Sequence, residues 1–341
     1  MTRRKRFKRV LITGAAGYVG SVLTPQLLEA GYEIVVYDTM FFGSEGLDAV
    51  KSHPALTIVE GDIRDTAAFT KALPGCDAVI HLACISNDPS FELDEGLSQS
   101  INFDCFEPMV VAAKKAGIRR FIYASSSSVY GVSDAPDVTE EHPLVPLTLY
   151  NKFKGLCEPL LFKHQTDDFV CVTVRPATIC GYGPRMRLDL SVNILTTHAV
   201  ANRKITVFGG SQLRPNLHIN DMADVYQLML EVDDKPIAGE IFNAGYQNHS
   251  IMNIAEMVKA VVEAEFPDKA PIEIVTTPSN DLRSYHVNSD KIKRVLGFTP
   301  ARSIEDAVRD ICNAFRANKL PDSLTDERYY NVKTMKSRKA A

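Results

Sequence analysis

Short apolar runs recur through the first half of the chain, and glycine or polar residues bound each of them. Continuous apolar runs of this kind are typical of strands that are buried on both faces of a parallel sheet. The pattern predicts strands at residues 9–13, 33–37, 56–59, 78–82, 120–124 and 170–174.

Helical spacing of apolar residues fills several of the gaps between these runs. The pattern predicts helices at residues 18–30, 66–72, 99–116 and 149–164. Gly31 suits the end of the first helix, whereas Pro25 removes a backbone donor inside it and is expected to bend it. Because strands and helices alternate, we predict an α/β fold, a doubly wound parallel sheet of the Rossmann type.

The alternation stops after about Gly181, where Pro, Gly and Arg become frequent. We therefore predict a sheet domain at residues 1–180, to which a segment at about 217–246 returns. Residues 181–330 are expected to form a smaller, interleaved α/β lobe. The chain from Asp322 onward is polar and basic and is predicted to be a peripheral or frayed tail, with residues 331–341 outside both domains.

Composition narrows the classes of function. The 341 residues are 45% hydrophobic and 23% charged, as in folded proteins generally. Lys and Arg total 38 against 42 Asp and Glu, so no basic surplus is present to neutralise a nucleic-acid backbone. No apolar run reaches the roughly 18 residues that cross a bilayer. We expect neither a nucleic-acid nor a membrane partner.

Cysteine usage points to a reducing compartment. The seven cysteines are scattered and form no Cys-x-x-Cys pair, so we predict neither a disulfide scaffold nor a metal site. The basic stretch at residues 1–9 lacks the apolar segment of a signal peptide and is expected to be a solvated leader. On these grounds we expect a cytoplasmic location.

A glycine-rich turn lies between the first predicted strand and the first helix. Gly14, Gly17 and Gly20 allow a tight turn, a close approach of the backbone to a pyrophosphate, and close packing of helix on sheet. Asp38 ends the second strand, where a carboxylate accepts hydrogen bonds from ribose hydroxyls and repels a 2′-phosphate. The pattern favours NAD over NADP, although Asp38 taken alone could be a turn residue.

Tyr150 and Lys154 lie one turn apart on one predicted helix face. A tyrosine ordinarily titrates near 10, and a nearby cation stabilises its phenolate. This pair alone is common by chance. However, the serine run at residues 125–128 directly follows a predicted strand, at the edge where such sheets bind ligands. A serine there can bond the oxygen whose proton Tyr150 removes.

In this order, the glycine turn, Asp38, the serines and Tyr-x-x-x-Lys resemble the extended short-chain dehydrogenase/reductase family. The chain is most similar to its nucleotide-sugar epimerases and dehydratases over residues 10–300. Further matches are His81-Leu-Ala, Arg175-Pro, Gly181-Tyr-Gly-Pro and residues 214–218.

The resemblance implies roles for individual residues. Ser126 would be the catalytic Ser/Thr, Tyr150 the general base and acid, and Lys154 the residue that binds the nicotinamide ribose. The expected NAD-binding residues are Gly14, Gly17, Tyr18, Val19, Gly20, Asp38, Asp62, Ile63, Leu82, Ala83, Cys84, Asn102, Tyr150, Lys154 and Ala177. The expected substrate-binding residues are Ser126, Thr178, Asn193, Arg214 and Arg283.

The partner implied by the resemblance is a nucleotide-diphosphate sugar. Arg185, Arg187, Arg214 and Arg283 are expected to gather at its diphosphate, because guanidinium groups bind phosphate bidentately. Surface ion pairs are the alternative for the arginines. The resemblance also implies a homodimer through the helices at 99–116 and 149–164, whose apolar residues could instead be buried within one chain.

The two residues after Ser126 narrow the choice of reaction. The 4,6-dehydratases of this family carry acidic residues at these positions, where this chain has Ser127 and Ser128. A hydroxyl cannot take a carbon-bound proton as a carboxylate can, so dehydration is disfavoured. Hydride transfer at a sugar carbon, with C4 as the expected position, predicts an epimerase.

Other functions stay open at this point. A 4-dehydrogenase or 4-ketoreductase would use the same residues, and residues 86–90 and 185–190 resemble enzymes that act on GDP-linked sugars. Thr178 and Asn216 depart from typical UDP-galactose epimerases. A non-catalytic NAD-binding scaffold is the alternative from another class, because a fold does not determine a function.

Overall fold

The computed structural model describes residues 6–133, 135, 137–279 and 284–339. Its centre is a seven-stranded sheet in the order β10-β6-β5-β4-β1-β2-β3, in which all neighbours pair in parallel. The strands are β1 (Arg9–Thr13), β2 (Glu33–Asp38), β3 (Leu56–Glu60), β4 (Ala78–His81), β5 (Arg120–Ala124), β6 (Val170–Pro176) and β10 (Glu240–Ala244). The predicted doubly wound α/β fold is confirmed.

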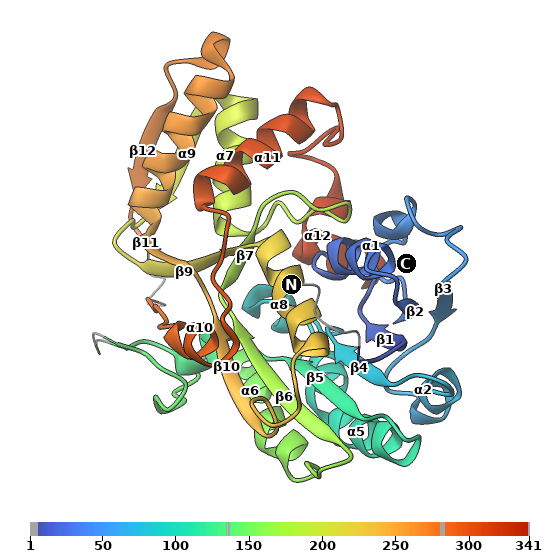
Figure 1. Cartoon of the computed structure of the whole chain (residues 1–341). Coiled ribbons are helices and arrows are strands. Elements are labelled where there is room, and N and C mark those ends of the chain that lie inside the picture. The colour runs from blue at the N-terminus through green and yellow to red at the C-terminus, as the bar shows by residue number, and fades with distance from the viewer. Residues whose placement is uncertain (1–5, 134, 136, 280–283, 340–341) are drawn as a thin grey trace.

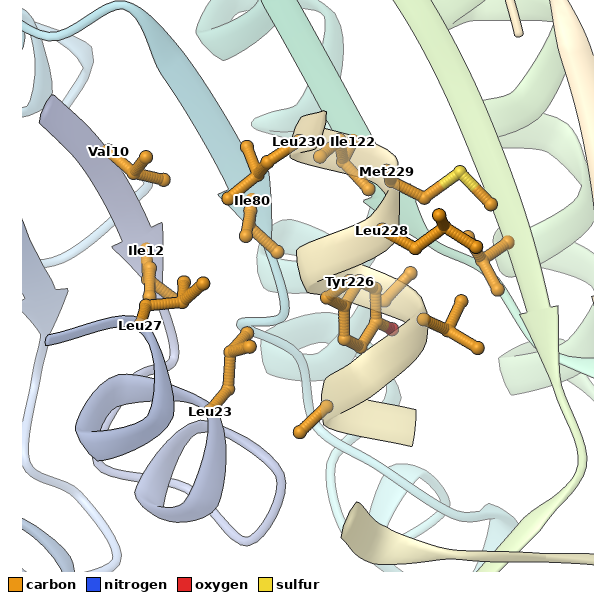
Figure 2. Close-up of a cluster of buried hydrophobic side chains, with 14 of the residues drawn as sticks. Val10, Ile12, Leu23, Leu27, Ile80, Ile122, Tyr226, Leu228, Met229 and Leu230 are labelled. Carbon is orange, nitrogen blue, oxygen red and sulfur yellow. The ribbon is translucent and has the colours of Figure 1, made fainter. Parts of the chain in front are cut away.

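One face of the sheet packs against α1 (Gly20–Glu29) and α8 (Ile219–Glu231). Figure 2 shows Leu23 and Leu27 of α1 and Tyr226 of α8 beside Ile12 and Ile80 of the sheet. These side chains are almost completely buried. The two helices are far apart in sequence, and the segment that returns to the sheet therefore supplies half of this core layer. Helix α1 continues through Pro25.

The opposite face packs against α2 (Thr66–Ala72), α5 (Phe106–Lys115) and α6 (Leu149–Phe162). The prediction of one continuous helix at residues 99–116 is wrong. The region contains the end of α4 (Glu95–Gln99), a π-helical segment (Ser100–Asp104) and α5. Asn102 lies in the π-helical segment and bonds the backbone N–H and C=O of Ile85, both within 2.9 Å. π-helical turns are frequently found at functional sites.

The second part of the chain has its own core. A three-stranded sheet contains β7 (Thr178–Cys180), β9 (Leu213–His218) and β11 (Gln247–Ser250), and a pair joins β8 (Lys204–Phe208) to β12 (Glu273–Thr277). Three helices pack together over an apolar cluster at one end of the molecule, namely α7 (Ser191–Asn202), α9 (Ile251–Glu265) and α11 (Ile304–Arg316) (Figure 1). A shorter helix, α10 (Asp290–Leu296), packs beside β10. The domain boundary at residue 180 stays a prediction.

The C-terminal segment differs from the frayed tail that the sequence suggested. Residues Asn331–Lys339 form helix α12, which packs against the short helix α3 (Asp88–Phe91). Asn331, Thr334 and Met335 are buried. The burial of Met335 and the hydrogen bonds of Asn331 hold this segment in place, and composition alone does not reveal either.

No helix among the described residues has both the length and the apolar character needed to span a membrane.

Candidate functional site

A cavity of about 580 Å³ opens at the carboxyl ends of the parallel strands. The loops after β1, β2, β4, β5 and β6 line it, together with α6 and α12. Most of the predicted site residues lie in its lining: Gly14, Gly17, Tyr18, Val19, Gly20, Asp38, Asp62, Ile63, Leu82, Ala83, Cys84, Ser126, Tyr150, Lys154, Ala177 and Thr178. The topology thus brings together predicted residues from Gly14 to Thr178.

The glycine turn is required by its neighbours. Gly14 has a φ of +73°, and a Cβ atom there would lie 2.6 Å from the backbone nitrogen of Ala83. A Cβ atom on Gly20 would lie 2.5 Å from Ala15. Any larger residue would therefore push the loop off β4 or open the first turn of α1. The turn leaves the N-terminus of α1 facing the cavity, where its N–H groups and dipole favour an anion.

Asp38 lies at the end of β2 with its carboxylate turned back toward the glycine turn. It accepts hydrogen bonds from the backbone N–H groups of Ala16 at 3.0 Å and Met40 at 2.9 Å. Burial raises the pKa of this carboxyl group, and the Ala16 N–H partly opposes the shift. The carboxylate retains acceptor capacity toward the cavity, because two backbone donors do not use all its lone pairs.

Tyr150 and Lys154 of α6 both line the cavity. Thr148 caps this helix by accepting a hydrogen bond from the Asn151 N–H. The Lys154 Nζ donates to the backbone oxygen of Ala124 at 2.7 Å and lies 5.2 Å from the ring centre of Tyr123. The end of β5 thereby fixes the direction of the ammonium group.

The protonation of Tyr150 is dominated by burial, which raises the pKa of its hydroxyl well above the usual value. The side chains of Cys84 and Asp88 raise this pKa further, and the Arg187 guanidinium lowers it. Tyr150 is therefore a protonated phenol in this cavity. It becomes a base only when more positive charge enters the site.

Ser126 lies at the start of a short 3₁₀ turn, Ser127–Tyr130, that follows β5. Its Oγ is 2.7 Å from the Oγ of Ser128, which in turn donates to the Asn151 side chain. Ser126 is thus held in a relay of hydroxyls that ends on α6. The relay leaves its oxygen within the cavity lining.

A buried ion pair between Arg175 and Glu158 supports the serine loop at residues 125–128. Arg175 of β6 donates to both carboxylate oxygens of Glu158 at 2.9 and 2.6 Å, and the side chains of both residues are 3% exposed. Glu158 also accepts from the Ser125 hydroxyl at 2.6 Å. Since Glu158 follows Lys154 by one turn of α6, the same helix positions Tyr150, Lys154 and the serine loop.

Some predicted residues lie elsewhere. Asn193 is buried outside the cavity lining, and its amide bonds Gly181, Tyr18 and Arg187. Asn102 also lies outside the lining, behind Ile85. The guanidinium of Arg214 lies 5.3 Å from the ring centre of Tyr285, which does line the cavity. Arg283 falls outside the described residues.

The four arginines expected at one diphosphate therefore do not all meet at the cavity wall. Arg185 and Arg187 line it, whereas Arg214 does not. Arg187 is already paired with Asp189 at 2.9 Å, and although burial alone would lower its pKa, that carboxylate holds it above the ordinary value. Burial lowers the pKa of Arg185 to about 10. Its guanidinium group therefore still carries a positive charge near neutral pH.

Sequence reasoning assigned no role to Asp88 or Asn331, yet both line the cavity. Asp88 opens α3 directly after the Asn87 cap, and its carboxylate accepts from the Thr148 hydroxyl at 2.6 Å. The Asn-Asp-Pro sequence of a helix start after β4 is a signal that could have found it. Asn331 carries no local signal of this kind.

Comparison with known proteins agrees with this geometry. The model of the family described as "NAD dependent epimerase/dehydratase family" matches residues 10–245. A dTDP-glucose 4,6-dehydratase from Streptomyces griseus is 29% identical over 308 residues, which cover 88% of this chain and 91% of that protein. A UDP-glucose 4-epimerase from Lactobacillus helveticus is 26% identical, with 88% and 94% covered.

Among solved structures, the chain is similar to DesIV, a dTDP-glucose 4,6-dehydratase from Streptomyces venezuelae with NAD bound. The TM-score is 0.80 at 25% identity, over 91% of this chain and 98% of DesIV.

Proposed function

The chain belongs to the NAD dependent epimerase/dehydratase family, and from this premise we propose that it is a nucleotide-sugar 4-epimerase. Members of the family are NAD-dependent enzymes that act on nucleotide sugars, and the cofactor is NAD. The single observation that carries the finer proposal is the set formed by Ser126, Tyr150 and Lys154 in one cavity, without a carboxylate at the two positions after Ser126.

The residues present fit NAD. The glycine turn would accept the pyrophosphate at the N-terminus of α1, and Asp38 would bond the adenosine ribose hydroxyls. Asp62 and Ile63 would flank adenine, and Leu82, Ala83, Cys84 and Ala177 would line the path to the nicotinamide. The Nε of Arg185 is buried without a hydrogen-bond partner among the described residues, which suits a cavity that receives an anionic ligand.

We infer that Tyr150 removes the proton of the sugar hydroxyl during oxidation and returns a proton during reduction. Bound NAD supplies the hydride acceptor and, once reduced, the hydride donor. The positive charge of the oxidised nicotinamide, together with Lys154, would bring the pKa of Tyr150 down from the value that burial sets. Ser126 would turn its hydroxyl proton from Ser128 to the same sugar oxygen, and Lys154 would hold the nicotinamide ribose.

The substrate class is a nucleotide-diphosphate sugar. Thr178, Asn193, Arg214 and Arg283 remain the predicted contacts of the nucleotide diphosphate. Thr178 lines the cavity, and Arg214 lies directly behind the lining residue Tyr285. Asn193 would act through the hydroxyl of Tyr18, which it bonds at 3.0 Å.

A second candidate, 4,6-dehydration, is favoured by one observation. Asp88 places a carboxylate in the cavity lining near enough to Tyr150 to raise its pKa. Such a group could take the carbon-bound proton that Ser127 and Ser128 cannot take. Asp88 already accepts a hydrogen bond from Thr148, so we rank dehydration second.

The test is incubation of the purified protein with UDP-, GDP-, dTDP- and CDP-linked hexoses, followed by NMR of the products and absorbance of NADH. An epimerase yields the C4 epimer with no net NADH. A 4-keto-6-deoxy product identifies a dehydratase, and stoichiometric NADH with a keto sugar identifies a dehydrogenase. If NAD binds and no sugar in the panel is changed, the catalytic proposal fails in favour of an NAD-binding scaffold.

We also propose that the protein is a homodimer through α6. Leu149 and Leu156 of this helix are exposed, and Leu144, Val145 and Leu147 continue the apolar surface along the preceding loop. Leu156→Glu should shift the molecular mass in light scattering to that of a monomer. Ile58→Glu, which alters a side chain of similar exposure on β3 (42% against 40%), should leave the mass unchanged.

A further inference from the structure

Asn331, the first residue of α12, closes a ring of hydrogen bonds at the cavity wall. Its Nδ2 donates to the Ser86 hydroxyl at 3.0 Å, and the same hydroxyl accepts from Arg187 at 3.1 Å. Arg187 binds Asp189, which also accepts from the Asn331 backbone N–H at 3.1 Å. Asn331 is only 2% exposed. The ring therefore ties the C-terminal segment to the loops after β4 and β7.

The same side chain also reaches the part of the cavity near Asp38. The Asn331 Oδ1 accepts from Arg185 at 2.6 Å. The guanidinium of Arg185 lies 4.8 Å from the ring centre of Phe42, which lines the cavity just after Asp38. Asn331 is therefore the link between the arginine on the Asp38 side and the Arg187–Asp189 pair on the Tyr150 side.

The rest of the segment is attached near the cavity at two further points, although Asn331 is its only described residue in the cavity lining. Before α12, the backbone oxygen of Tyr329 accepts from the Leu188 N–H at 2.9 Å. Toward the end of α12, the Arg338 guanidinium lies 5.2 Å from the ring centre of Phe41, another residue of the lining. The match to the family model ends at residue 245, before this segment begins.

We propose that residues 326–339 form a strap that retains NAD in the cavity between turnovers, and that Asn331 is the positioning residue of this strap. The inference rests on the NAD dependence of the proposed function but not on the identity of the sugar. A dinucleotide that lies between Asp38 and Tyr150 would run along the wall that Asn331 holds together, so we expect the segment to move when the dinucleotide leaves. Such retention suits an epimerase, because a redox-neutral cycle regenerates its own cofactor.

The experiment measures how fast NADH leaves the full-length protein. The protein is loaded with NADH and chased with excess NAD, and the loss of bound NADH fluorescence is followed with direct excitation of the reduced nicotinamide. Asn331→Ala removes the links to Arg185 and Ser86 and should speed dissociation by about tenfold or more. Lys336→Ala, on the exposed face of the same helix, should leave the rate within about twofold of wild type.

Thermal unfolding without cofactor separates this role from a structural one. A folded Asn331→Ala protein with an unchanged NADH dissociation rate would overturn the strap. If that variant fails to fold, limited trypsin digestion of the wild-type protein tests the proposal instead. Trypsin can cleave this segment after Arg328, Lys333 and Arg338. Saturating NAD should slow these cleavages severalfold, and equal cleavage with and without NAD would reject the inference. Absence of NAD binding by the wild type would instead refute the proposed function.

Discussion

The cavity wall that carries Tyr150 and the wall that carries Asn331 are held by different kinds of interaction. Lys154 bonds a backbone oxygen of β5, and Glu158 pairs with Arg175 of β6. These contacts join a helix to the strands that it covers. The Asn331 wall is held by side chains that meet from loops up to 245 residues apart.

The difference suggests that the two walls have different stabilities. The Tyr150 wall is tied to strands β5 and β6 of the sheet, so we expect it to open only when α6 leaves the sheet. The Asn331 wall depends on a terminal segment with few buried apolar side chains, and segments of this kind open locally at low cost. If the Asn331 wall opens while the Tyr150 wall stays in place, ligands can exchange without loss of the geometry around Tyr150.

The largest expected effect tests whether Tyr150 and its wall of the cavity carry out the chemistry. Tyr150→Phe removes the proton-transfer group and should lower kcat by about 10³-fold, within the range typical of general acid–base groups. NAD affinity, measured by calorimetry, should change little. Tyr246→Phe is the matched control, because Tyr246 is 49% exposed and lies outside the cavity. Full activity of Tyr150→Phe would place the chemistry elsewhere.

The next prediction tests the buried Glu158–Arg175 ion pair that stabilises the same wall. Glu158→Gln leaves Arg175 without its buried counter-ion and should lower the free energy of unfolding by about 3–5 kcal/mol. Urea titration measures the change. Glu273→Gln, which breaks an exposed pair with Lys204 at 3.8 Å, should cost less than about 1 kcal/mol. Equal costs would show that the wall does not depend on its buried ion pair.

A third prediction concerns the pH dependence of the sheet beneath Lys154. Burial lowers the pKa of His81 to about 3, with the Lys154 charge adding to the shift. A lowered pKa in the folded state means that stability is present above about pH 6.5 and is lost as the pH falls toward 3. Between pH 7 and pH 4 the loss from this group should be roughly 3 kcal/mol.

His81→Gln should remove that part of the acid destabilisation, as measured by urea titration at both pH values. His53→Gln alters an exposed histidine and should leave the difference between the two pH values unchanged. If His81→Gln and wild type lose stability in parallel, His81 titrates alike in the folded and unfolded chains.

The smallest expected effect concerns the boundary between the walls, where Asp38 faces Arg185. Asp38→Asn removes the negative charge that repels a 2′-phosphate, so the ratio of NADP to NAD dissociation constants should fall about tenfold. Isothermal calorimetry with both nucleotides measures the ratio. Asp62→Asn, whose carboxylate is paired with Arg64 at 2.9 Å, is the control and should keep it. An unchanged ratio in Asp38→Asn would remove the basis for cofactor choice.

Much of the Tyr150 wall could be predicted because its signals are local. The strands at 9–13 and 120–124 and the helix at 66–72 agree with the structure at both ends. Tyr150 and Lys154 are one helical turn apart, and that spacing alone places them together. Ser126 comes just after a strand, so the edge of the sheet determines its location.

The errors arose where distant contacts decide the outcome. The helix predicted at 99–116 is interrupted because Asn102 bonds Ile85, which lies 17 positions earlier. Arg185 and Arg187 were grouped with Arg214 by charge, but Asp189 and Asn331 compete for their guanidinium groups. The polar tail was expected to fray because its composition offers few apolar residues, whereas its polar groups find buried partners.

The sequence by itself determined the parallel sheet, the glycine turn, the position of Asp38 and the Ser126, Tyr150 and Lys154 set, because each depends on the spacing of neighbouring residues along a strand, turn or helix. Only the tertiary structure decided that Asp88 and Asn331 belong to the cavity and that Asn102 and Asn193 lie outside its lining. Those placements depend on hydrogen bonds between side chains that are far apart in the sequence. The spacing of residues along the chain does not show which of them become partners.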